Sequence, residues 1–305
     1  MKIKNVHGAP LLLSVITVLM IAVHYTDISF LSVGGDAYLS MAVLQLLVFA
    51  VPSAIYARAR GRRFISHVRL RLFKAVDIPL MIFALGVMIF GGATLNFYFY
   101  KMMPQVYAAS SSSGSVTSGI NGVGDALYGV VAAGILPAIT EEFLYRGIVI
   151  AEYERNGTAL AVILSSVTFA LIHFSLVRLP VYIFYGIMLA LVLYATRSVI
   201  ASMTVHMANN ILVMFFEIYV YRAAVIQGVG IVLFTFICTA LTILFAFLFF
   251  SAAGRAYADL AEKNVPSDYT RRKKLPGERY VSEALLSPFF ILLIVLSIVG
   301  ILINM

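Results

Sequence analysis

The chain has 305 residues, of which 62% are hydrophobic and only 12% are charged, with a formal net charge of +8. A soluble domain carries about 25% charged residues, so this composition excludes a soluble globular protein and indicates a protein surrounded by lipid. The single cysteine, Cys238, excludes both a disulfide framework and a cysteine-based metal site.

Apolar stretches recur along the whole chain, and a bilayer-spanning helix needs roughly 20 such residues. We therefore predict an all-α polytopic membrane protein with one transmembrane domain over residues 1–305 and about nine transmembrane helices. Eight is the alternative, if the first or last stretch is peripheral. The predicted spans are 9–30, 38–57, 76–99, 126–153, 158–176, 180–196, 199–221, 226–253 and 283–304.

Basic residues fall in alternate loops and are concentrated at 58–75 and 254–280. The positive-inside rule makes these two loops cytoplasmic and places the N-terminus in the cytoplasm as well. The charge favours contact with anionic lipid headgroups over nucleic acid, which we exclude as a partner. A low-complexity segment at 109–119 is predicted to be a linker.

Ionisable residues inside predicted spans are costly in hydrocarbon and are functional candidates. Three short patterns contain most of them: EEFLYR at 141–146, FALIH at 169–173 and HMANN at 206–210. Pro137, four residues before Glu141, is expected to distort the helix that carries the first pattern. Asn209 is interpreted as a helix–helix hydrogen bond.

Helical phase separates the two neighbouring carboxylates of the first pattern. Glu142 and Arg146 share one helix face and can form an ion pair, whereas Glu141 points about 100° away from Glu142. Glu142 lies 15 residues before Gly157, and His173 lies 16 residues after it. If both helices run straight, a carboxylate and an imidazole therefore lie at the same membrane depth.

A carboxylate beside a neutral imidazole in a pocket of low dielectric can deprotonate water. His206 and Asn210 share a helix face and could donate hydrogen bonds to a developing oxyanion. The alternative assembly uses two histidines and one glutamate as zinc ligands, although the sequence contains no H-E-x-x-H motif.

The three patterns match E-E-x-x-x-R, F-x-x-x-H and H-x-x-x-N, in that order and on separate helices. In this the chain resembles the CPBP family of intramembrane proteases, which includes the CAAX prenyl endopeptidases and the Abi group of bacteriocin-processing and immunity proteins. The resemblance covers a motif-bearing core at about 124–220. It implies that Glu141 activates water with His173 as its partner, and that His206 and Asn210 form the oxyanion site. Glu142, Arg146 and Phe169 would be supporting residues. In a metal-dependent version, Glu141, His173 and His206 would hold a divalent metal such as zinc.

The predicted function is an intramembrane endopeptidase of the CAAX or Abi type, acting on a peptide or protein substrate at the membrane. No cofactor is required by the metal-free version of this mechanism. The alternatives are a non-catalytic immunity or scaffold membrane protein and a proton-coupled transporter, although the chain contains no inverted repeat. The predicted location is the plasma membrane of a prokaryote.

Overall fold

The computed structural model describes residues 5–25, 37–102, 123–154, 157–225, 229–262 and 285–303. Over these residues the regular structure is entirely helical, which confirms the predicted fold class. The elements are α1 (Asn5–Tyr25), α2 (Ala37–Gln45), η3 (Leu46–Ala50), α3 (Val51–Arg60), α4 (Arg62–Ile65), η4 (Ala75–Asp77), α5 (Ile78–Met102), α7 (Val123–Gly129), η6 (Val130–Ile135), α8 (Leu136–Glu142), η7 (Phe143–Val149), α9 (Ile150–Tyr153), α10 (Thr158–Leu171), α11 (Leu179–Thr196), α12 (Val199–Val225), α13 (Val229–Glu262) and α15 (Pro288–Ile303).

Each of the nine predicted stretches contains a helix. Within the described residues, five helical segments are long and apolar enough to cross a membrane. They are Tyr38–Arg60, Ala75–Phe99, Gly124–Tyr153, Leu179–Thr196 and Gly230–Asp259. Four shorter apolar helices are His7–Val23, Thr158–Leu171, Val199–Phe215 and Pro288–Ile303. The polytopic architecture is therefore supported, while the count of nine crossings and the orientation of the N-terminus stay predictions. The predicted linker at 109–119 lies outside the described residues.

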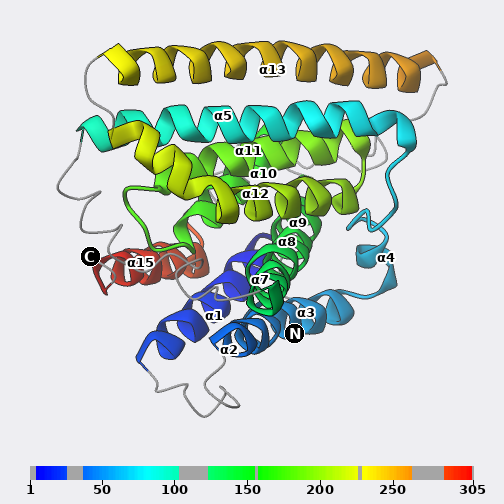
Figure 1. Ribbon diagram of the computed structural model, residues 1–305. Helices are drawn as coiled ribbons and strands as arrows, with labels where there is room; N and C mark the ends of the chain where they lie inside the picture. Colours follow the sequence, from blue (N-terminus) through cyan, green and yellow to red (C-terminus); the bar gives the residue numbers. More distant parts are fainter. Residues whose placement is uncertain are drawn as a thin grey trace.

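The helices pack around two apolar clusters. Figure 1 shows α13 and α5 side by side at one edge of the bundle, with α11, α10 and α12 next to them. One cluster fills the space among α5, α11, α12 and α13, and includes Met88, Leu189 and Phe249. The other joins α1, α10 and α15 to the segment that follows Glu142, and includes Ile16 and Ile148. The motif-bearing helices contribute residues to both clusters, since Phe169 of α10 belongs to one and Val205 of α12 to the other.

The outer face of α13 is apolar and exposed. The side chains of Val232, Phe236, Ile243, Phe247 and Phe250 all project from the bundle. An apolar surface of this extent marks contact with a membrane or a partner rather than with water. It agrees with the composition of the chain, which indicates lipid as the surrounding solvent.

The ends of α10 and α13 differ from the predicted spans. Helix α10 stops at Leu171, before the predicted end at 176, because Phe174 adopts the left-handed conformation with φ of +48°. Helix α13 runs on to Glu262, past the predicted end at 253, so it takes up the first part of the predicted basic loop 254–280. Residues 263–280 of that loop lie outside the described residues.

Two arginines of the basic loop at 58–75 form ion pairs with buried glutamates. Arg60 forms a bidentate ion pair with Glu152, in which Nε donates to Oε1 at 2.6 Å and Nη2 donates to Oε2 at 2.7 Å. Arg69 pairs with Glu154. Both glutamates follow the EEFLYR segment along the chain and are almost completely buried. These two ion pairs therefore hold the C-terminal end of the motif-bearing helix against the basic loop. The sequence did not predict this contact.

Candidate active site

The helix that carries the first motif is irregular on both sides of Glu141. The order along the chain is α7, η6, α8, η7 and α9, in which η6 and η7 are π-helical turns. Pro137 lies in the first turn of α8 and has no N–H, so the carbonyl of Ala133 cannot make its usual helical hydrogen bond. The predicted distortion at Pro137 therefore takes the form of a wider turn directly before it. Single π turns within α-helices are frequent at functional sites.

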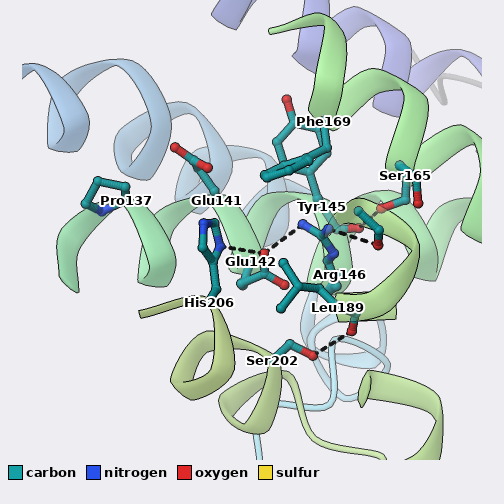
Figure 2. A network of polar contacts seen from close by, with 12 residues as sticks. Pro137, Glu141, Glu142, Tyr145, Arg146, Ser165, Phe169, Leu189, Ser202 and His206 are labelled. Atoms are coloured by element: carbon teal, nitrogen blue, oxygen red, sulfur yellow. Dashed lines mark hydrogen bonds and ion pairs between the residues drawn. The ribbon is translucent and has the colours of Figure 1, made fainter. Parts of the chain in front are cut away.

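Glu142 is the centre of a buried charged cluster. Its Oε1 accepts a hydrogen bond from Arg146 Nη1 at 2.7 Å, and it also lies 2.9 Å from His206 Nδ1 (Figure 2). The side chains of Glu142 and Arg146 are completely buried. The predicted ion pair between Glu142 and Arg146 is therefore present, and it reaches the third motif through His206.

Arg146 makes two further contacts that hold neighbouring helices together. Its Nη2 donates to the carbonyl oxygen of Gly186 in α11 at 3.1 Å. Its guanidinium carbon lies 4.5 Å from the centre of the Phe169 ring, within the range of a cation–π contact. Arg146 therefore links the first motif to α10 and α11 as well as to Glu142.

Phe169 is the apolar contact shared by the three motifs. Its ring meets the rings of Tyr145, His173 and His206 edge to face, with centroids 5.3, 4.9 and 5.8 Å apart. Rings in this geometry attract one another and restrict each other's orientation. The contacts suit the supporting role expected for Phe169, because they restrict the orientation of both candidate imidazoles.

Glu141 has surroundings that differ from those of Glu142. Figure 2 shows its carboxylate pointing away from the Glu142–Arg146 pair. Its Oε1 accepts a hydrogen bond of 3.3 Å from Nε2 of Gln45, the last residue of α2. The side chain is buried but lines two cavities. As helical phase predicts, the two adjacent carboxylates point in different directions.

His173 lies in the turn after α10, not inside the helix as expected. Its Nδ1 is 2.7 Å from the carbonyl oxygen of Phe169, and its ring stacks on Tyr182 with centroids 3.9 Å apart. Because a carbonyl oxygen can only accept, Nδ1 carries the hydrogen, and Nε2 of the neutral ring has a lone pair. The structure therefore favours the tautomer in which Nε2 can accept a proton.

His206 also uses Nδ1, in this case toward the Glu142 carboxylate. A carboxylate accepts, so Nδ1 carries the hydrogen, and Nε2 can donate to an oxyanion only when the ring is doubly protonated. The amide of Asn210 has no such requirement. Of the two predicted oxyanion donors, Asn210 is therefore the one whose donor group is always present.

Two cavities meet at Glu141 and His173. The first, which we call the apolar cavity, has a volume of about 460 Å³ and is lined by α1, α2, η3 and α15 together with Pro137, Glu141 and His173. The second, the polar cavity, has a volume of about 540 Å³. Its polar lining comprises Asn96, Glu141, His173, Arg178, Tyr182, Tyr185, His206, Asn209 and Asn210. All four residues predicted to be catalytic therefore line one cavity.

Asn209 does not make the expected helix–helix hydrogen bond through its carbonyl group. The side chain is buried, and within the described part of the chain its Oδ1 has no hydrogen-bond partner. Asn209 lines the polar cavity beside Asn210. Its oxygen is therefore a buried acceptor that does not join the two helices.

The comparison with protein families agrees with this geometry. Residues 124–212 match the family model described as type II CAAX prenyl endopeptidase Rce1-like. This segment is an Rce1-like domain of the CPBP family. No curated protein and no solved structure matches the chain.

The Rce1-like domain contains all three motifs, so the predicted resemblance is confirmed. The family and the apolar helices together suggest an intramembrane endopeptidase in an integral membrane protein. The roles of the individual residues are not tested by this match and stay predictions.

The alternative metal set does not form in the structure. Among the residues that the structure describes, no three His, Cys, Asp or Glu side chains are grouped closely enough to hold a metal ion. Glu141, His173 and His206 all line the polar cavity but do not make such a group. As they are placed, these residues do not fit a metal centre.

Sequence reasoning missed several residues around the site. Gln45 contacts Glu141 from outside the Rce1-like domain, and it belongs to a stretch without any recognisable motif. Tyr182 stacks on His173 from α11, yet in sequence it is one aromatic residue among many in an apolar helix. Neither contact has a local sequence signal, because each depends on how distant helices pack.

Proposed function

We propose that the Rce1-like domain hydrolyses a peptide bond of a membrane-associated substrate with a water molecule activated by Glu141. One observation carries the proposal: Glu141 and His173 lie together on the wall of both cavities, while Glu142 is occupied by Arg146 and His206. A carboxylate beside an imidazole lone pair is the arrangement that general-base catalysis needs.

In the first step, a water molecule lies between the Glu141 carboxylate and Nε2 of His173. Glu141 takes one proton, and His173 Nε2 accepts a hydrogen bond from the other, which orients the oxygen. The oxygen then adds to the carbonyl carbon of the scissile peptide bond and forms a tetrahedral intermediate. The tautomer of His173 supports this role, because the Phe169 carbonyl already occupies Nδ1.

In the second step, the carbon–nitrogen bond breaks. The intermediate carries a negative oxygen, to which the amide of Asn210 would donate a hydrogen bond, joined by Nε2 of His206 in its protonated form. Protonated Glu141 returns its proton to the leaving amine. The water oxygen ends in the new carboxyl group, and the side chains regain their starting state.

The substrate is identified by comparing membrane peptides from cells that contain the wild-type protein with peptides from cells that contain Glu141→Gln. A peptide cleaved only in wild-type cells is then incubated with purified protein. Loss of its cleavage with both Glu141→Gln and His173→Ala supports the proposal. Equal cleavage by wild type and both variants contradicts it, and an unchanged cellular phenotype with Glu141→Gln indicates the non-catalytic alternative.

We further propose that all nine apolar helices cross the membrane, with the N-terminus in the cytoplasm of a prokaryotic cell. The distribution of Lys and Arg supports this topology. Single cysteines introduced into the loop at 58–75 of a Cys238→Ser protein provide the test. An impermeant thiol reagent added to intact cells is expected to leave them unlabelled, and labelling there contradicts the orientation.

A further inference from the structure

Gln45 contacts the proposed catalytic carboxylate from a part of the chain that the family match does not include. It is the last residue of α2, whereas the Rce1-like domain covers 124–212. Its Nε2 donates to Oε1 of Glu141 at 3.3 Å and to Oγ1 of Thr140 at 2.8 Å. Gln45 thus bridges two consecutive residues of α8.

The hydrogen bonds of Thr140 determine whether the nitrogen or the oxygen of the Gln45 amide faces Thr140 and Glu141. The Thr140 hydroxyl donates to the carbonyl oxygen of Leu136 at 3.0 Å, so its oxygen remains free to accept. An ionised Glu141 can also only accept. Both partners therefore require the NH₂ group of Gln45, and its two hydrogens match two acceptors.

We infer that Gln45 is a positioning residue for Glu141, an inference that rests on the proposed function. The hydrogen bond to Oε1 restricts rotation of the carboxylate, so that Oε2 remains to meet the water molecule. A base held in the correct geometry reacts faster than one that samples several rotamers. The active site then consists of the Rce1-like domain together with α2.

The position of Gln45 relative to the cavities separates this role from substrate binding. Gln45 lines the apolar cavity and is not among the residues of the polar cavity, which contains His206 and Asn210. Gln45 therefore affects a substrate held in the polar cavity through its contact with Glu141, and does not touch that substrate itself. Removing the amide is expected to lower kcat and to leave KM nearly unchanged.

The experiment measures kcat and KM of full-length purified protein on one cleaved peptide. Gln45→Met keeps the length of the side chain but removes the donor, and kcat is expected to fall about tenfold or more, as for loss of a hydrogen bond to a charged group. Leu44→Ala is the matched control, because Leu44 lines the same cavity beside Gln45. Its kcat is expected to stay within about threefold of wild type, as at sites without a direct catalytic contact.

A structural effect is separated from positioning by a double variant. If Gln45 acts through Glu141, then Gln45→Met lowers the rate of wild type but not the residual rate of Glu141→Gln. Equal fold losses in both backgrounds overturn the inference. If Gln45→Met does not fold, Gln45→Glu keeps the size of the side chain and places a second carboxylate against Glu141. Its kcat is then expected to fall further than that of Leu44→Ala, and a wild-type kcat overturns the inference.

Failure of this inference differs from failure of the proposed function. If Glu141→Gln cleaves the peptide at the wild-type rate, the proposed function is wrong. If Glu141→Gln is inactive while Gln45→Met has wild-type kcat, only the role of Gln45 is wrong.

Discussion

Glu141 and Glu142 are adjacent in sequence, yet their carboxylates bind different partners. Glu142 is bound to Arg146 and His206 in the protein interior, whereas Glu141 receives a hydrogen bond from Gln45 and faces two cavities. Removing a side chain that pairs with a buried cation leaves that cation without a counter-charge, whereas a side chain that faces a cavity is available for chemistry. Substitution of Glu142 is therefore expected to lower the stability of the protein, and substitution of Glu141 to lower its activity.

Glu142→Gln is expected to destabilise the protein by about 3–5 kcal/mol, because it leaves the buried Arg146 without its counter-charge. Unfolding of the purified protein in detergent micelles, followed by helical circular dichroism, measures the loss. The matched control is Glu141→Gln, the same chemical change one residue earlier. Similar losses of stability in both variants would contradict the division of roles.

Asn210→Ala is expected to lower kcat by about 10²–10³, the effect of removing one oxyanion donor. The KM should change little, because the interaction forms only as charge develops on the substrate oxygen. Leu212→Ala serves as the control, since Leu212 lines the same polar cavity without a polar atom. A loss that appears in KM alone would assign Asn210 to substrate binding.

The ring of Tyr182, which stacks on His173, is expected to affect kcat, whereas the Tyr182 hydroxyl is not. Tyr182→Phe keeps the ring and should retain nearly the full rate. Tyr182→Ala removes a contact worth about 0.5–1.5 kcal/mol and should lower kcat about two- to tenfold. Measurements of kcat for both variants test this prediction. An equal loss of kcat in both would show that the rate depends on the Tyr182 hydroxyl rather than on the stacked ring.

Gly186 allows α10 and α11 to approach closely at the point where Arg146 binds the Gly186 carbonyl. A Cβ at this position would lie 2.7 Å from the backbone Cα of Ser166, so Gly186→Ala is expected to destabilise the protein by about 1–3 kcal/mol. Gly254→Ala in α13 is the control, because its Cβ would point into open space. It should be neutral or stabilise by up to about 1 kcal/mol. Unfolding midpoints that shift equally in both variants would exclude the clash.

Hydrophobicity and local spacing were sufficient to predict the helices and the separation of the two carboxylates. Apolar stretches identify helices because lipid requires every backbone group to be paired internally. The spacing of Glu142 and Arg146 predicts their ion pair because helical neighbours lie three or four residues apart. These features depend on residues that are close in sequence.

Contacts between distant segments could not be predicted in this way. Gln45 reaches Glu141 across 96 residues, and Arg60 reaches Glu152 across 92. The end of α10 before His173 was also missed, because the apolar sequence continues through the left-handed residue Phe174. The predicted register assumed two straight helices, whereas the π-helical turns and this early end break that assumption. Glu141 and His173 nevertheless line the same cavities.

The most direct test of the central claim is a single-turnover reaction of enzyme in excess over peptide, in water enriched in ¹⁸O, followed by mass spectrometry of both product and protein. If Glu141 acts as a base, one ¹⁸O appears in the new carboxyl group of the product and none in Glu141, and Glu141→Gln forms product only at a small residual rate. Label in the Glu141 side chain, or product formed at the wild-type rate by Glu141→Gln, would contradict the role of Glu141 as the base that activates water.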